Sequence, residues 1–106
     1  MDLPEAVQQF ILKYINSVDQ LEILLLLKQD PQRDWTPEEV AQTLRTHPNA
    51  ASSRMEELAA NHLLSEKKVN DKTQYRYQPR TPDVSAAVEQ LAQAHPTYRV
   101  SIISLI

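Results

Sequence analysis

Histidine often signals catalysis or metal binding, and this chain has three, at positions 47, 62 and 95. They lie far apart in sequence, whereas paired metal ligands are usually separated by about three to five residues. The chain has no cysteine, which excludes disulfides, thiolate nucleophiles and cysteine metal sites. It also has no glycine, which excludes the glycine-rich loops that cradle nucleotide phosphates. We therefore predict that the chain binds no metal and no cofactor.

Paired carboxylates and hydroxyls are present, but their spacing does not suit catalysis. Glu38-Glu39 and Glu56-Glu57 are adjacent pairs in segments that we expect to be helical. Neighbouring side chains on a helix point about 100° apart, so neither pair converges on a substrate. Ser52-Ser53 has no histidine or aspartate placed as a nucleophile's base. We therefore predict that the chain has no catalytic residues and is not an enzyme.

The remaining candidate chemistry is electrostatic, and it is concentrated between Glu66 and Arg80. This stretch has five basic and two acidic residues, a local charge of +3, whereas the whole chain carries −3 and the remainder therefore −6. A basic segment on an acidic body is the distribution that phosphate contact from one face requires. The alternative is a solvated hairpin whose lysines protect an edge strand. We favour phosphate contact, with the candidate cations Lys67, Lys68, Lys72 and Arg76.

A short helix should precede these cations. Thr36 and Glu39 have the spacing of a capping box, and Pro37 between them suits the first helical position. Pro48 disfavours helical geometry at the residue before it, so we expect this helix to end near Arg45.

A second helix should run from 48 to 61. Its apolar stripe predicts a buried face made of Ala51, Met55, Leu58 and Ala59. Among the remaining positions, those that we expect to face a partner are Asn49, Ser52, Ser53 and Arg54.

A two-stranded hairpin should follow, with strands 65–69 and 73–78. Alternation places Tyr75 and Tyr77 on one strand face and Arg76 on the other. Leu63-Leu64 should re-enter the core just before the hairpin. We expect Trp35 to begin a short strand that pairs with it.

The segment 35–79 resembles the winged helix-turn-helix domain of bacterial regulators of the MarR and PadR kind. The matching residues are Thr36-x-x-Glu39-Val40-Ala41-x-x-Leu44, then Met55-x-x-Leu58, then Leu63-Leu64 and a charged hairpin. Such domains usually have glycine before the Leu-Leu pair, in a left-handed conformation. Asn61-His62 stands there instead, and both residue types tolerate that conformation better than most.

Two helices should precede this segment. Residues 2–15 have a continuous apolar stripe, with Asp2 and Glu5 as a capping box. Ser17 should cap a helix over 18–29, with Gln20 three residues on. Five consecutive apolar residues, 23–27, predict that this helix is central and buried on nearly all sides. We also expect Leu21, Leu24, Leu25, Val40, Leu44, Met55, Leu58 and Leu64 to form one core.

Another helix should begin after Thr81, and Pro96 should open a last helix over the apolar residues up to 106. A strand is the alternative for this last segment, because it is rich in β-branched residues. The apolar end at Leu105-Ile106 indicates either a buried terminus or a chain cut inside a longer helix. The resemblance favours the cut, since similar proteins continue this helix.

We therefore predict a mainly α fold with a small β-hairpin, a winged helix-turn-helix with extra N- and C-terminal helices. Residues 1–106 should form one domain, with the helix-turn-helix over 35–64, the wing over 64–79 and a C-terminal helical segment over 81–106. The apolar content, without a membrane span or a signal pattern, favours a cytoplasmic protein.

Two functions fit this architecture. The first is a transcriptional regulator that binds double-stranded DNA as a homodimer, with helix 48–61 in the major groove and the wing on phosphates. Glu56 weighs against this, because a carboxylate on that face repels phosphate. The second is a protein-interaction or dimerisation module that binds no DNA. For the dimer interface we expect Phe10, Tyr14, Val100 and Ile103.

Overall fold

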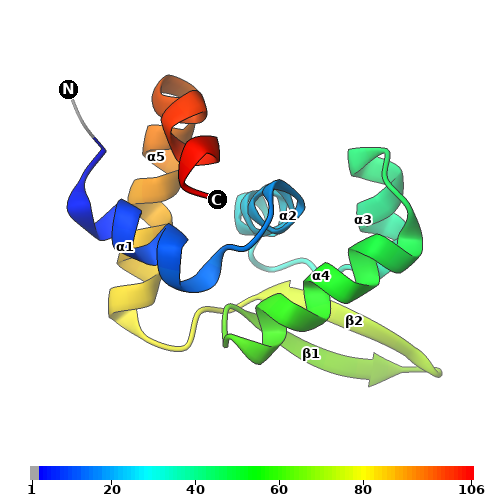
Figure 1. Ribbon diagram of the computed structural model, residues 1–106. Helices are drawn as coiled ribbons and strands as arrows, with labels where there is room; N and C mark the ends of the chain where they lie inside the picture. Colours follow the sequence, from blue (N-terminus) through cyan, green and yellow to red (C-terminus); the bar gives the residue numbers. More distant parts are fainter. Residues whose placement is uncertain (1–2) are drawn as a thin grey trace.

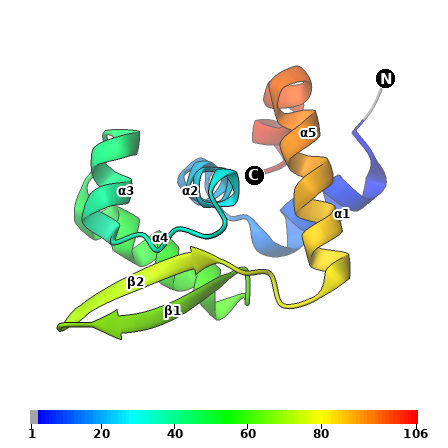
Figure 2. The same cartoon turned by 180° about the vertical axis from the view of Figure 1, so that it is seen from behind.

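The computed structural model describes residues 3–106, which form five helices and one antiparallel hairpin. In chain order the elements are α1 (Glu5–Tyr14), α2 (Val18–Gln29), α3 (Pro37–Leu44), α4 (Pro48–Ala60), β1 (Leu64–Val69), β2 (Lys72–Tyr77) and α5 (Pro82–Leu105). In Figures 1 and 2, α2 lies in the middle, with α1 and α5 on one side and α3 and α4 on the other. The hairpin extends beneath α4. The fold is therefore an α+β winged helix with additional N- and C-terminal helices, as the sequence predicts.

The two N-terminal helices form close to their predicted bounds, and the predicted Ser17 cap of α2 is confirmed. The α1 helix begins at Glu5, and Pro4 precedes it without a side-chain cap. The predicted Asp2–Glu5 capping box involves Asp2, which lies outside the described residues. Ser17 caps α2 by accepting a hydrogen bond from the backbone N–H of Gln20. The Gln20 side chain does not complete a capping box with Ser17, because it accepts from the backbone N–H of Asn16 instead.

The helix-turn-helix forms within a residue of the predicted bounds. Thr36 and Glu39 form both halves of the capping box, at 3.2 and 2.9 Å. Arg45 ends α3 in the left-handed conformation, with φ 57°. After α4, the left-handed residue is His62, with φ 64°. The predicted left-handed residue at Asn61-His62 is therefore confirmed, and it is the histidine.

The hairpin is closed by Asn70 and Asp71, which both have positive φ, as a type I′ turn requires. The strands pair from Leu64 opposite Tyr77 to Val69 opposite Lys72, so each begins one residue before its predicted start. Trp35 adds a bridge to β2, because its backbone N–H and C=O both pair with those of Tyr75, at 2.7 and 2.8 Å. This confirms the predicted pairing of Trp35 with the hairpin.

The C-terminal helix contains a kink. Thr81 caps α5 by accepting from the backbone N–H of Val84. Pro96 lies inside the helix, and Tyr98 has non-helical angles, φ −113° and ψ 30°. Proline removes a backbone donor and clashes with the preceding turn, which explains the break. The predicted last helix therefore exists, and it follows the kink instead of beginning at Pro96. In both views the chain then turns back and ends between α5 and α2 (Figures 1 and 2).

One hydrophobic core joins all these elements. Leu21, Ile23, Leu24 and Leu27 of α2 are fully buried in it. Leu25 is half-buried, and so is Leu44, which corrects the prediction that both lie inside the core. The reason is geometric, since α1 and α5 cover one side of α2, α3 and α4 another, and a stripe between them stays open. Within residues 3–106, no helix combines the length and the apolar character needed to cross a lipid bilayer.

Candidate nucleic-acid interface

The outward face of α4 carries the short polar side chains of Asn49 and Ser53. Asn49 and Ser53 are exposed, and Ser52 is half-buried at the edge of this face. On the inner face, Ala51, Met55 and Leu58 are buried in the core. The core therefore anchors α4 along one side and leaves the side with Asn49 and Ser53 free for a partner.

His47 caps the start of α4, a role that the sequence analysis did not assign. Its ring Nδ1 accepts a hydrogen bond from the backbone N–H of Asn49 at 3.1 Å. Pro48 at the first helical position has no N–H, so the second position offers the first donor to cap. A histidine directly before a proline that opens a helix is the signal that would have identified this cap.

The tip of the hairpin lies next to the exposed side of α4. Ser52, Asp71, Lys72 and Thr73 line one shallow hollow of about 210 Å³, together with the first turn of α3. Short polar side chains from the helix and a lysine from the hairpin are thereby brought to the same surface. This juxtaposition is the central feature of the candidate interface.

The strand register divides the candidate cations of the hairpin between two faces. Ser65 pairs with Arg76, Lys67 with Gln74, and Val69 with Lys72. Because side chains alternate along a strand, Lys67, Lys72 and Arg76 share the face opposite the core. Lys68 lies on the same face as Tyr75. The register therefore places Lys68 on one face of the hairpin and Lys67, Lys72 and Arg76 on the other.

Two of these cations are bound by a carboxylate of the chain itself. Arg76 donates from Nε and Nη2 to the two oxygens of Asp34, at 3.0 and 3.2 Å. Lys67 Nζ lies 2.8 Å from Asp34 Oδ2. Hydrogen bonds from Lys67 and then Arg76 lower the pKa of Asp34 below its usual value. Lys67 and Arg76 are therefore already paired, whereas Lys68 and Lys72 take part in no ion pair within residues 3–106.

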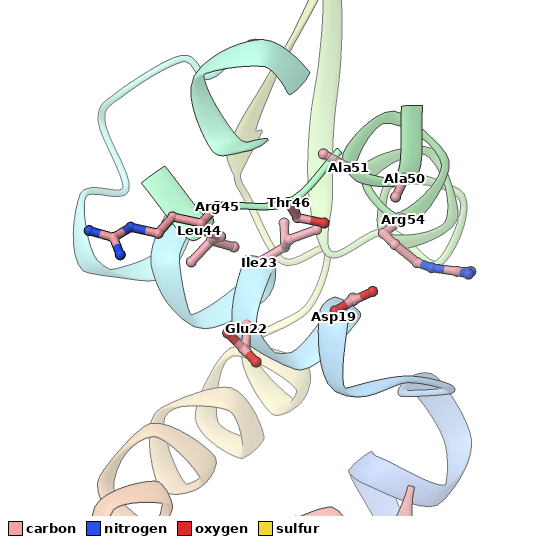
Figure 3. Close-up of a pocket in the computed structure, with 9 residues that line it drawn as sticks. All are labelled: Asp19, Glu22, Ile23, Leu44, Arg45, Thr46, Ala50, Ala51 and Arg54. Atoms are coloured by element: carbon pink, nitrogen blue, oxygen red, sulfur yellow. The ribbon is translucent and has the colours of Figure 1, made fainter. Parts of the chain in front are cut away.

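Arg54 is also paired and lies off the exposed face of α4. It is one position after Ser53, about 100° further around the helix. Figure 3 shows it leaving α4 beside a pocket of about 200 Å³ that Asp19 and Glu22 of α2 also line. Its Nη1 donates to both oxygens of Glu57, at 2.9 and 3.0 Å, which lowers the pKa of Glu57. Arg54 is therefore not among the DNA contacts that we propose below.

Three carboxylates surround the candidate surface: Glu38 at the start of α3, Glu56 on α4 and Asp71 in the hairpin turn. All three are exposed. A phosphate backbone would have to pass these charges, which restricts the orientations in which a duplex can approach. Among residues 3–106, no three His, Asp or Glu side chains gather closely enough to hold a metal ion.

The residues expected at a dimer interface differ in their exposure. Phe10 is only 4% exposed and packs against Tyr14, with ring centroids 5.1 Å apart and the ring planes tilted by 43°. Its burial within one chain excludes it from the interface that we propose below, because α1 turns this side toward α5. Tyr14 and Ile103 are half-buried, and Val100 is 79% exposed. Leu12, which the sequence analysis did not consider for this role, is 61% exposed.

No protein-family model matches this sequence, and no curated protein matches it significantly. Solved structures do match its fold. HlyU from Vibrio cholerae N16961 superposes with a TM-score of 0.63 and 22% identity, covering 93% of this chain and 99% of HlyU. A mutant of Staphylococcus aureus MepR bound to an oligodeoxyribonucleotide gives a TM-score of 0.65 and 14% identity, covering 96% of this chain and 74% of MepR.

Two further similar structures extend this comparison. The winged helix-turn-helix DNA-binding domain of Mb0332 from Mycobacterium bovis, described as homodimeric and as a possible ArsR-family regulator, gives a TM-score of 0.60 and 23% identity. It covers 82% of this chain and 79% of that domain. For the adhesin competence repressor AdcR of Streptococcus pyogenes, with a TM-score of 0.58 and 20% identity, the match covers 82% of this chain and 63% of AdcR. These likenesses establish that the chain has the winged-helix fold of such transcriptional regulators.

Proposed function

We propose that this chain is a DNA-binding transcriptional regulator without enzymatic activity. Asn49, Ser52 and Ser53 of α4 enter the major groove, and the hairpin tip contacts phosphates through Lys68 and Lys72. The observation that carries the proposal is the shared surface of α4 and the hairpin tip, where Ser52 and Lys72 line one hollow. The winged-helix regulators of similar fold, one of them bound to DNA, support it.

The division of roles follows from side-chain chemistry. Serine and asparagine have short side chains that hydrogen-bond base edges, and such contacts specify sequence. Lysine is a point charge on a flexible stem, and its phosphate contacts position the protein without reading sequence. Asn49 and Ser53 are therefore the specificity residues of this proposal, and Lys68 and Lys72 supply affinity.

Fluorescence anisotropy with labelled duplexes over a salt series tests the proposal. The variant Lys68→Ala/Lys72→Ala should weaken binding to every duplex alike. It should also reduce the slope of log K against log salt by about 0.9 for each lost contact. The matched control is Lys13→Ala/Arg99→Ala, which removes the same charge from exposed positions on α1 and α5. Because these positions flank the exposed Leu12 and Val100, sedimentation must first show that the control has the oligomeric state of the wild type. If the wild type binds no duplex even at low salt, the proposed function is wrong.

We also propose that the chain acts as a homodimer through apolar side chains on α1 and on α5 after its kink. Leu12 and Val100 are the most exposed large apolar residues there, and Tyr14 and Ile103 are half-exposed. Burial of such residues favours association. Sedimentation should show a dimer that Val100→Glu weakens, while Ala86→Glu, at an exposed site earlier in α5, should not. A wild-type monomer at high micromolar concentration would contradict this.

The motif from Thr36 to Leu64 favours a regulator of the MarR or PadR kind within this fold. The alternative function is a protein-interaction module that binds no DNA. The three carboxylates around the candidate surface and the exposed Leu12 and Val100 favour it. Absence of duplex binding together with a stable dimer would select this alternative.

A further inference from the structure

Asp34 lies in the short segment between α2 and α3, directly before Trp35. The backbone of Trp35 pairs with that of Tyr75 through two hydrogen bonds. In this antiparallel pairing, the residue before Trp35 lies opposite the residue after Tyr75, which is Arg76. The backbone itself therefore places Asp34 beside Arg76, and the side-chain contact does not depend on a flexible loop.

The contact occupies the donors that a phosphate would use. The guanidinium of Arg76 binds both oxygens of Asp34 in a fork, the arrangement in which arginine also binds phosphate. Lys67, diagonally across the hairpin, places its ammonium group against the same carboxylate. One carboxylate thus neutralises part of the hairpin's basic excess and satisfies two of its cations.

We propose that Asp34 is a positioning residue that withholds Lys67 and Arg76 from DNA phosphates and so limits the affinity and salt dependence of duplex binding. This inference rests on the proposed function. It assigns the phosphate contacts to Lys68 and Lys72, the two hairpin lysines outside this cluster. It also makes Asp34 a residue that limits how strongly the chain binds DNA of any sequence.

The first test is Asp34→Asn, measured by anisotropy over a salt series. Freed from Asp34, Lys67 and Arg76 should bind phosphates, and the slope of log K against log salt should steepen by about 0.9 for each. Kd at low salt should fall roughly twofold to fivefold, the range that exposed ion pairs cover. The control Asp83→Asn removes the same charge from an exposed site at the start of α5 and should leave the slope unchanged.

A double-mutant cycle separates release of these two cations from a general charge effect. In a Lys67→Ala/Arg76→Ala background, Asp34→Asn should no longer change the slope. Lys67→Ala/Arg76→Ala alone should leave the wild-type slope nearly unchanged, because both cations are already held. This second variant keeps the proposal testable if Asp34→Asn does not fold. A weaker or unchanged salt dependence in folded Asp34→Asn, or a steeper one that persists in the double-variant background, would overturn the inference.

A heparin column distinguishes failure of this inference from failure of the proposed function. If the wild type binds no duplex at low salt, the DNA-binding function is wrong. The inference about Asp34 is then tested by elution from heparin alone. Asp34→Asn should elute from heparin at higher salt than the wild type and Asp83→Asn. Equal elution of all three proteins would show that Asp34 does not compete with a bound polyanion for Lys67 and Arg76.

Discussion

The side-chain amide of Gln20 donates a hydrogen bond to Glu57 at 2.6 Å and joins the first turn of α2 to α4. Gln20 is fully buried, and its oxygen also accepts from the backbone N–H of Asn16. Because Glu57 also binds Arg54, one polar network connects the central helix to the helix that we propose to enter the major groove. This network fixes the orientation in which α4 packs against α2.

Replacing Gln20 with alanine should destabilise the protein. The backbone N–H of Asn16 would lose its side-chain partner, while Glu57 Oε1 would lose one donor and keep Arg54. We expect a cost of about 1–3 kcal/mol, and the cavity would add to this. Urea denaturation measures the loss. Gln42→Ala, at an exposed site on α3, is the control and should change stability by less than about 0.5 kcal/mol. Equal effects of the two substitutions would show that the buried network contributes nothing.

Adjacent leucines on α2 should differ in their importance to the core. Leu24 is fully buried, and Leu25 is half-buried on a groove that α5 also lines. Leu24→Ala should cost about 2–5 kcal/mol, and Leu25→Ala clearly less, since its side chain already contacts water and leaves no closed cavity. Denaturant melts of the two variants give the comparison directly. A larger loss for Leu25 would mean that α5 closes over it.

The chain has no glycine, so non-glycine residues occupy its left-handed positions. His62 has φ 64°, and its side chain is exposed. The steric cost of this left-handed conformation is therefore offset by little packing of the side chain. His62→Gly should stabilise the protein by about 1 kcal/mol. Asn61→Gly, one residue earlier with φ −87°, should destabilise it, because glycine there only adds freedom to the unfolded chain. Thermal melts that move in the same direction for both would refute this explanation.

Acid should weaken the start of α3. The backbone N–H of Thr36 donates to the Glu39 carboxylate and lowers its pKa, with Arg33 adding to the effect. A carboxylate whose pKa is lower in the folded state stabilises the protein above its unfolded pKa. This stabilisation is lost as pH falls through the folded value. The stability advantage of the wild type over Glu39→Gln should therefore be full near neutral pH and decline as pH falls below about 4.3, the unfolded pKa, toward the lower folded one. Glu38→Gln, the neighbouring exposed carboxylate, is the control for a general charge effect in melts from pH 7 to 3.

Local sequence signals predicted the helix-turn-helix and the hairpin correctly, because they depend on nearby residues. The Thr36–Glu39 capping box, Pro37 and Pro48 set the bounds of α3 and the start of α4 by local sterics and hydrogen bonding. The capping role of His47 was missed, although it too is local.

The ion pairs of the candidate site were predicted less well, because they join residues far apart in sequence. The sequence predicts that Trp35 pairs with the hairpin, but it does not specify a register. With Trp35 opposite Tyr75, Asp34 has to lie beside Arg76, and that single alignment changes the role of two of the four hairpin cations.

The amino-acid sequence by itself determined the elements of this protein and the outward polar face of α4, since periodicity and caps act within a few residues. Only the tertiary structure decided which cations remain free and which apolar residues remain exposed. Arg54, Lys67 and Arg76 are bound by Glu57 and Asp34, and Phe10 is buried against the chain's own core. The physical reason is that charge pairing and burial depend on which surfaces the packed elements bring together. Local periodicity and caps do not specify which residues far apart in sequence become neighbours.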